Sequence, residues 1–287
     1  MLSKAVLLAI ALSSRVVAFA YFYPGNAGRL PNFGGGFGYN RGFGPNRGLW
    51  RQRLGFGPVV DPVGQRPATQ PGRAQTIILA NGSNRMLSAP GVFPLDYNFA
   101  TTMSLVLSGS NVIVFDTGLS KDAALLRTAL RGRGVLPGQV THVVQSHEHM
   151  DHTMNTGLFP NAVVIADVSR YEPATDTYSI LVLNPADPNS RLDIDANVSI
   201  KPTLGHAAND RTMYVSNDQT YGKIALVGDL FNDRSDVRLV VDASARTSQE
   251  LVDSQRRVVC DEDVQYIAPG HGPPFQVDAA FRAQYGC

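Results

Sequence analysis

Short runs of apolar residues, separated by turn residues, recur along the chain from residue 76 onward. This pattern predicts β-strands at Thr76–Ala80, Thr102–Leu107, Val112–Phe115, Thr141–Gln145, Ala162–Ala166, Tyr178–Leu183, Val198–Pro202, Thr212–Val215, Lys223–Val227 and Val264–Ala268. The second and third of these strands are expected to form a hairpin across the turn at residues 108–111. The histidine-rich sequence SHEHMDHT follows directly on the fourth.

Two other segments show the spacing of an amphipathic helix. The first is predicted to begin at the N-cap Ser120 and to end at Gly132 and Gly134, with Leu126, Ala129 and Leu130 on its inward face. The second is predicted to open with a capping box of Thr247 and Glu250, with Leu251, Val252, Val258 and Val259 inward. Many strands with few helices between them predict packed sheets with helices outside, rather than a regular β/α alternation.

The first twenty residues have the pattern of a secretory signal peptide. Lys4 supplies a positive charge, Ala5–Leu12 is wholly apolar, and residues 18–20 (Ala-Phe-Ala) fit a cleavage site. Arg15 interrupts the apolar stretch, so no transmembrane segment is expected here. We predict a signal peptide at residues 1–20 and a secreted protein, with a mitochondrial presequence or an uncleaved anchor as the alternatives.

Residues 21–73 differ in composition from the rest of the chain. They contain GGGFGYNRGFGPNRG, and residues 21–60 carry several arginines but no acid. Too few branched apolar residues occur here to offset chain entropy, so we predict a disordered arm followed by a folded domain at residues 74–287. The arm is either a flexible spacer or a basic, aromatic segment that binds RNA or extracellular polyanions.

Overall composition is that of a globular protein. Of the 287 residues 44% are hydrophobic and 17% charged, and the formal net charge of +1 gives no bulk attraction to nucleic acid or anionic membranes. Asn81 and Asn197 lie in acceptor tripeptides for N-glycosylation. Cys260 and Cys287, the two cysteines, could pair in an oxidising compartment. Composition does not determine the oligomeric state, and a homo-oligomer is one of the alternatives.

The sequence SHEHMDHT is the strongest chemical signal in the chain. It sets His147, His149, Asp151 and His152 within six residues. Imidazole and carboxylate are ligands of zinc, iron and manganese, and this spacing can divide them between two metal ions.

Four further acids and histidines follow predicted strands. They are Asp116 in FDTG, His206 in GHAAND, Asp229 in VGDLF and His271 in PGHG. Residues at strand ends can point into one cleft at the edge of a sheet. Five of the six histidines fall in the motif or at such ends, and His142, within a strand, is predicted to have a core or hydrogen-bonding role.

Together these residues resemble the metallo-β-lactamase superfamily. HEHMDH is similar to its H-x-H-x-D-H signature, and its later His, Asp and His positions are filled. The resemblance runs from residue 76 to the end of the chain and implies an α/β fold, the four-layer αβ/βα sandwich: two mixed sheets face to face, helices on both outer sides, and metals at one edge.

The resemblance also implies a role for each site residue. The first metal would be held by His147, His149 and His206, the second by Asp151, His152 and His271, and both by a bridging Asp229. Asp116 would orient the ligands through hydrogen bonds. The implied cofactors are two divalent metal ions, zinc in the first place and iron or manganese as alternatives.

The predicted reaction is hydrolysis by water that two metal ions activate to hydroxide. Asp151 is expected to orient that hydroxide or accept its proton, and His206 and Asp229 complete the predicted catalytic set. A phosphodiester, including RNA, and a small activated ester or thioester would both suit this chemistry.

Further segments resemble the metallo-β-lactamase domain-containing protein 1 group within the superfamily. They are VFDTG, GRGVLPGQVTHVV, GLFPNAVV, VGDLF and APGHGPPF. The resemblance implies a metal-dependent hydrolase with an endoribonuclease role. Two other hypotheses remain: an iron-dependent oxidoreductase similar to sulfur dioxygenases, which share the ligands, and a catalytically idle secreted binding protein.

Overall fold

The computed structural model describes residues 64–87, 97–187, 189–243 and 247–287. The predicted signal peptide and most of the predicted arm lie outside the described residues. Residues 64–73, the last part of that arm, lead into the first strand, and the Gly64 N–H donates to the Arg131 carbonyl over 2.8 Å. The domain boundaries stay predictions. Within the described part of the chain, no helix is long and apolar enough to cross a membrane.

The strands of the described residues follow one another in the N-terminal and central parts as β1 (Ala74–Ala80), β2 (Ser83–Met86), β3 (Tyr97–Ala100), β4 (Met103–Ser108), β5 (Asn111–Phe115), β6 (His142–Val144), β7 (Val163–Ala166), β8 (Ser169–Glu172) and β9 (Thr177–Ile180). The later ones are β10 (Leu192–Asp193), β11 (Val198–Pro202), β12 (Arg211–Asp218), β13 (Gly222–Gly228), β14 (Tyr266–Pro269) and β15 (Phe275–Gln276). The helices are α1 (Ala123–Gly132), α2 (Met150–Thr153), α3 (Gln249–Arg256) and α4 (Ala279–Gln284).

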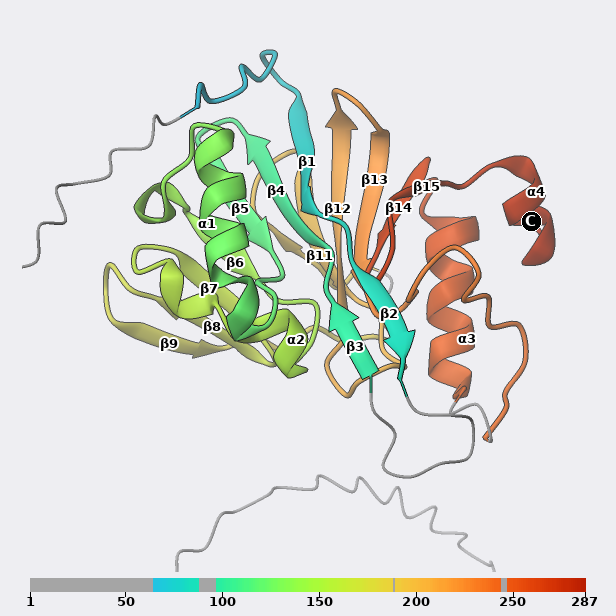
Figure 1. The fold of residues 1–287 in the computed structure, drawn as a ribbon. Coiled ribbons are helices and arrows are strands. Elements are labelled where there is room, and N and C mark those ends of the chain that lie inside the picture. Colours follow the sequence, from blue (N-terminus) through green and yellow to red (C-terminus); the bar gives the residue numbers. More distant parts are fainter. Residues whose placement is uncertain (1–63, 88–96, 188, 244–246) are drawn as a thin grey trace, which may run out of the picture. The chain divides into compact units, whose positions relative to one another are not determined.

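Hydrogen bonds join thirteen of these strands in the order β15-β14-β13-β12-β1-β4-β5-β6-β7-β8-β9, with β11 and β10 branching from β12 (Figure 1). β1 pairs with β4 along its length but with β12 through Ala74 and Asp218 alone. The sheet therefore divides into an N-terminal half, β1 and β4–β9, and a C-terminal half, β10–β15. β2 and β3 form a separate hairpin.

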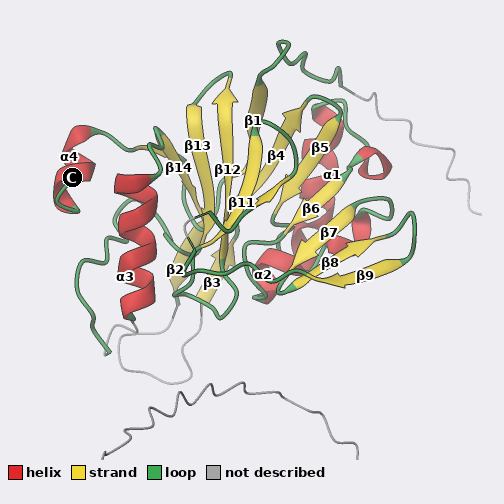
Figure 2. Ribbon diagram, turned by 180° about the vertical axis from the view of Figure 1, so that it is seen from behind, coloured by secondary structure: helices red, strands yellow, loops and turns green. Residues whose placement is uncertain are grey.

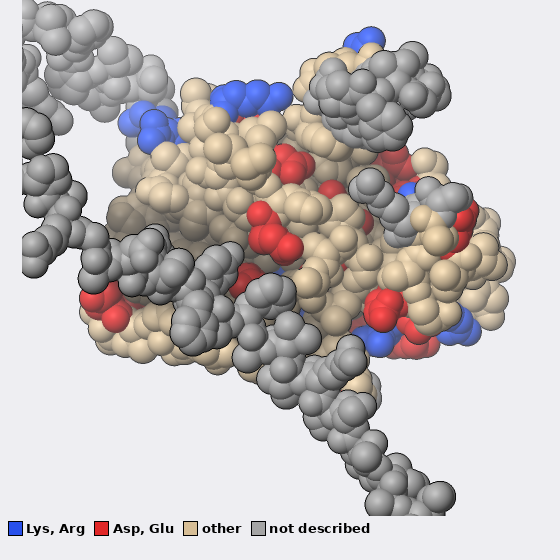
Figure 3. Space-filling view, turned by 90° about the horizontal axis from the view of Figure 1, so that it is seen from below, with Lys and Arg blue, Asp and Glu red and all other residues tan. Residues whose placement is uncertain are grey.

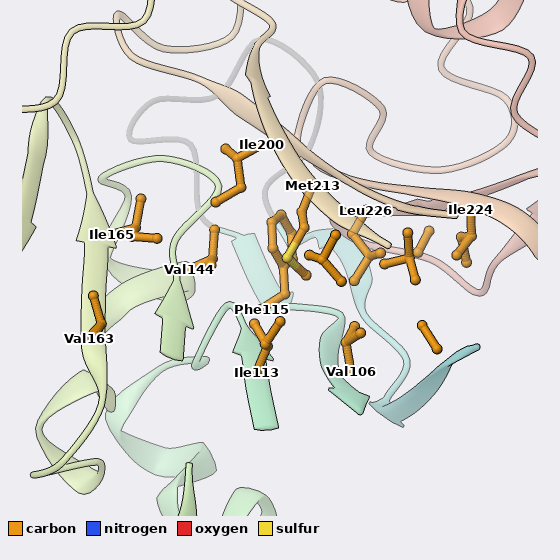
Figure 4. Packing of buried hydrophobic residues seen from close by; sticks show 14 residues of the cluster. Val106, Ile113, Phe115, Val144, Val163, Ile165, Ile200, Met213, Ile224 and Leu226 are labelled. Atoms are coloured by element: carbon orange, nitrogen blue, oxygen red, sulfur yellow. The ribbon is translucent and has the colours of Figure 1, made fainter. Parts of the chain in front are cut away.

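The two halves pack face to face over a central hydrophobic core. Ile113, Phe115 and Val144 from the N-terminal half share this core with Met213 and Leu226 from the C-terminal half (Figure 4). Because successive side chains of a strand point to opposite faces, a strand covered on both sides reads as a continuous apolar run. The strands β4, β5 and β13 are largely apolar for this reason, whereas β9, also among the predicted strands, lies at the sheet edge and is largely exposed.

Helices cover the outer face of each half (Figure 2). Leu126 and Leu130 of α1 pack in a second core with Val112 and Val114 of β5. A third core lies under α3 and α4 and includes Leu251, Val227, Ile267 and Phe281. The four layers confirm the predicted αβ/βα sandwich, with the qualification that one pair of residues joins its two sheets.

Two predicted helix starts are wrong by one or a few residues. A 3-10 turn at Ser120–Asp122 precedes α1, so Ser120 does not cap it. α3 is capped by Ser248, whose side chain accepts from the Leu251 N–H. Thr247 cannot take that role because its backbone pairs with Asp242 in a short β-bridge.

Two other predicted features differ in part from the structure. Val252, expected to face inward, is half-buried. β9 ends at Ile180 rather than Leu183, since the chain beyond it no longer pairs with β8.

Cys260 and Cys287 form a disulfide, with their Cα atoms 5.8 Å apart. It ties the C-terminus to the segment after α3 across 27 residues of chain. Replacing both cysteines with serine is expected to lower the free energy of unfolding by about 3–4 kcal/mol, because the unfolded chain gains conformational freedom. Urea denaturation measures this change. Reductant should lower the unfolding midpoint of the wild type and leave that of the double variant unchanged. An unchanged midpoint in the double variant would contradict it.

Candidate metal centre

The histidine motif begins where β6 leaves the middle of the N-terminal half-sheet. The chain then passes into the single turn of α2, which carries Asp151 and His152. His147 and His152 are almost fully buried, with 1% and 0% of their surface exposed, whereas His149 is exposed. The N-terminal half thus contributes four of the predicted ligands.

The C-terminal half contributes the other three predicted ligands. His206 follows β11, Asp229 follows β13 and His271 follows β14. Gly228, just before Asp229, has φ 54°, and a side chain there would collide with Ser146. A glycine at this position therefore lets the two halves approach each other at the site.

The structure brings all seven predicted ligands together in two groups. His147, His149, His206 and Asp229 form the first, and Asp151, His152 and His271 form the second. In each group the potential ligand atoms lie within 4.8 Å of one another. Which metal ion each residue holds stays a prediction.

Asp229 lies between the groups. Its Oδ1 is 3.2 Å from His152 Nε2, and its Oδ2 is 3.2 Å from His271 Nε2 and 3.5 Å from His206 Nε2. One carboxylate therefore reaches ligands of both groups, as a bridging role requires.

Two buried atoms at the centre test whether the site fits a metal ion. His152 Nε2 and Asp229 Oδ1 lie 3.2 Å apart and make no hydrogen bond to any further group. Leaving a buried polar atom unsatisfied is costly, and cations satisfy such nitrogen and oxygen atoms. Imidazole nitrogens and carboxylate oxygens are also the donors that zinc, iron and manganese accept. The residues present therefore fit divalent metal ions.

The carboxylate of Asp116 makes hydrogen-bonding contacts with the histidine motif. It accepts from the Ser146 N–H over 2.7 Å and the Ser146 hydroxyl over 2.8 Å, and it lies 2.7 Å from His152 Nδ1. A proton on Nδ1 leaves Nε2 of His152 free to bind a metal ion. Asp116 has φ 56°, a left-handed conformation that is strained for most residues and often found at functional sites.

Burial and neighbouring charges shift the pKa values of the predicted ligands in different directions. Burial and the nearby His152 lower the pKa of His147 to about 2, so its imidazole is neutral. Burial alone would raise the pKa of Asp229, but His152 and His271 hold it well below its usual range. Burial lowers the pKa values of His152 and His271, but the carboxylates of Asp116 and Asp229 outweigh it and raise them, so a metal ion bound there would displace a proton.

Sequence reasoning missed three residues that support the ligands. The Thr101 hydroxyl donates to the Asp151 carbonyl over 2.7 Å, and the Ala100 carbonyl accepts from His271 Nδ1 over 3.0 Å. Asp210 accepts from the His206 N–H over 2.7 Å, and burial raises its pKa to about 7. The position of Asp210 four residues after His206, within one loop, was a usable signal.

The other predicted positions lie away from the centre. Asn81 is exposed, whereas Asn197 is half-buried and its side-chain amide contacts Ser108 and Asn217. Whether either asparagine carries a glycan stays a prediction. His142 is half-buried on β6, with Nδ1 2.9 Å from the Thr141 hydroxyl, and belongs to neither ligand group.

A cleft of about 890 Å³ opens beside the centre, a size suited to a small molecule. His149, Asp151, His206, Asp229 and His271 lie in its wall. Figure 3 shows the face seen from below Figure 1, on which acidic side chains lie both in the middle and at the margins, and basic ones mainly at the margins.

The family model for the metallo-β-lactamase superfamily matches residues 97–271, and the chain belongs to this superfamily. Human metallo-β-lactamase domain-containing protein 1 is 33% identical over 169 residues, which cover 58% of this chain and 59% of that protein. The chain spans about half to two thirds of the length of such curated relatives.

Two other similarities concern the fold and one short segment. A solved structure from Thermotoga maritima, assigned to the metallo-β-lactamases, matches with a TM-score of 0.52 at 19% identity, covering 71% of this chain and 99% of that one. An N-acyl homoserine lactonase of Agrobacterium fabrum is 49% identical over 45 residues, 16% of this chain and 17% of that protein. The similarity to the Thermotoga maritima structure supports the sandwich fold.

Proposed function

We propose that this protein is a metal-dependent hydrolase with a dinuclear centre. The observation that carries the proposal is the convergence of seven histidine and aspartate side chains in two adjoining groups of potential metal ligands. The short similarity to a lactonase, an enzyme that hydrolyses a cyclic ester, also supports it. When bound, two divalent ions would polarise the electrophile and lower the pKa of water.

The side chains of this protein have separate tasks in the proposed reaction. His147, His149 and His206 would hold one ion, Asp151, His152 and His271 would hold the other, and Asp229 would serve as a ligand of both. Asp151 borders the cleft, and the Thr101 hydroxyl contacts its carbonyl and carboxylate oxygens. Asp151 is thereby positioned to orient the attacking water and to accept its proton.

The proposed substrates are a phosphodiester, including RNA, or an activated ester or thioester. The endoribonuclease activity implied by the sequence resemblance belongs to the first class. The nitrogen and oxygen donors favour zinc, with iron or manganese as alternatives. Metal analysis with an oxygen-consumption assay separates this proposal from an iron-dependent oxidoreductase.

Metal removal and one ligand variant test the proposal. Chelation is expected to abolish hydrolysis over a panel of an aryl ester, a thioester, bis(4-nitrophenyl) phosphate and single-stranded RNA, and added zinc to restore it. His149→Ala is expected to lower kcat/KM by about 10²-fold or more, because an electrostatic contributor to the transition state is weakened. His142→Ala removes a half-buried histidine outside the centre and serves as the matched control.

Two results would refute the hydrolase proposal. One is metal-loaded wild-type protein that turns over no member of the panel. The other is His149→Ala protein with the metal content and activity of the wild type.

We further propose that the protein is secreted. The disulfide between Cys260 and Cys287 supports this, because such bonds persist in oxidising compartments. The predicted signal peptide supports it from the sequence. Binding of polyanions by the predicted arm stays a prediction.

A further inference from the structure

The cleft beside the metal centre has an apolar side. Leu87 and Met150 line it and are 57% and 70% exposed, and Leu119 and Phe99 lie in the same wall. Exposed large apolar side chains at a binding cleft indicate a ligand with an apolar part.

One cation in the cleft wall has no acidic partner. Lys121 lies on the turn before α1, and its Nζ is 3.3 Å from the Phe99 carbonyl and 3.5 Å from Asn98 Oδ1, both neutral acceptors. Within the described residues, no acid lies within ion-pair distance of it. The positive charge of Lys121 is therefore available to a ligand.

Arg238, the other cation that lines the cleft, differs in this respect. Its Nε is 2.5 Å from Asp236 Oδ1, and its Nη1 donates to the Thr247 hydroxyl. The acid offsets the charge of this guanidinium. Lys121 is thus the better candidate for binding an anion.

Lys121 lies in the wall of the same cleft as Asp151 and His271. Phe99, whose carbonyl accepts from Lys121, also packs its ring 5.2 Å from the ring of His271, measured between centroids. A ligand group bound to Lys121 would therefore share the cleft with the metal centre and the apolar wall.

From this arrangement we propose that the substrate is a small ester or thioester that combines an apolar segment with a terminal anionic group, and that Lys121 binds that group. This inference rests on the proposed hydrolase function. Water adds its oxygen to the carbonyl carbon, the bond to the alcohol oxygen or thiol sulfur breaks, and the leaving group takes up a proton.

RNA fits the cleft less well than such an ester. Binding a polyanion requires several cations along its backbone. The described cleft wall offers Lys121 as its one cation without an acidic partner, since Arg238 is paired with Asp236.

A pair of substrates that differ only in a terminal carboxylate tests the inference. We expect metal-loaded wild-type protein to prefer the mono-4-nitrophenyl ester of adipate to 4-nitrophenyl hexanoate by roughly tenfold in kcat/KM, mainly through KM, as a new charge-assisted contact would give. Lys121→Met should remove this preference and Lys121→Arg should keep it. Arg127→Met, which removes an exposed charge on α1 outside the cleft, is the matched control.

Direct binding gives a readout that does not depend on turnover. By titration calorimetry, Lys121→Met should weaken the binding of adipate roughly tenfold and leave that of hexanoate unchanged. Pimelate in place of adipate tests the length of the apolar segment, and 5-phosphonopentanoate, which has the same methylene chain as adipate, tests a phosphonate as the anion.

The outcomes of these experiments distinguish the proposed anion site at Lys121 from the proposed hydrolase function. Equal adipate affinity in the wild type and Lys121→Met overturns the anion site. Adipate binding that depends on Lys121, in metal-loaded protein that turns over no member of the substrate panel, supports the anion site and overturns the hydrolase. Equal use of both esters together with efficient cleavage of single-stranded RNA overturns the small-ester substrate and leaves the hydrolase standing.

Discussion

Asp229→Asn is expected to give the largest loss of activity of any single substitution in the centre. Asp229 contacts both ligand groups, at 3.2 Å from His152 Nε2 and 3.2 Å from His271 Nε2. The amide keeps the shape of the side chain but removes the negative charge between the two sites. We expect kcat/KM to fall by about 10²–10³-fold, as for loss of one strong electrostatic contributor to the transition state.

Metal content, measured by mass spectrometry on dialysed protein, should fall in parallel with activity. Asp253→Asn, an exposed position on α3, provides the control for loss of one carboxylate. Asp229→Asn protein that retains the wild-type metal content and activity would show that the carboxylate does not bridge the sites.

Asp116→Asn should weaken metal binding without removing a ligand. The carboxylate fixes the His152 ring through Nδ1, and an amide oxygen is a weaker acceptor than a carboxylate oxygen. Loss of such an outer partner typically costs about 10–100-fold in metal affinity or activity. Asparagine tolerates the left-handed backbone at this position, so the substitution separates the hydrogen bond from the backbone strain.

Competition with a chromophoric chelator measures the affinity, and thermal unfolding of the metal-free protein measures the stability. Ser146→Ala is the companion variant, because it removes a neutral hydroxyl that contacts both Asp116 and His147 Nδ1 and leaves the contact between Asp116 and His152. An unchanged zinc dissociation constant in Asp116→Asn would argue against the orienting role.

The central strands were predictable because they are covered on both faces. β5 and β13 read as continuous apolar segments, since their alternate residues enter different cores. β2 and β8 were missed because they are short and carry polar residues, SNRM and SRYE. Such strands form through pairing with their neighbours, and local sequence records that pairing weakly.

The ligands of the site were predictable for a different reason. Histidine is scarce in this chain, and its chemistry together with that of a nearby aspartate is visible in a short sequence such as SHEHMDHT. Ala100 and Thr101 left no such signal, because a backbone carbonyl exists in every residue and a threonine hydroxyl is common. Their approach to His271 and Asp151 depends on the tertiary fold.

The ligand set draws on both halves of a sheet that one residue pair, Ala74 and Asp218, joins. A bound metal ion would therefore act as a cross-link between two layers that otherwise meet mainly through apolar packing. Ligands that bind only the native state stabilise it in proportion to the logarithm of their free concentration. Metal supply would thus govern how long the two layers stay closed against each other, and hence the lifetime of the folded protein as well as its chemistry.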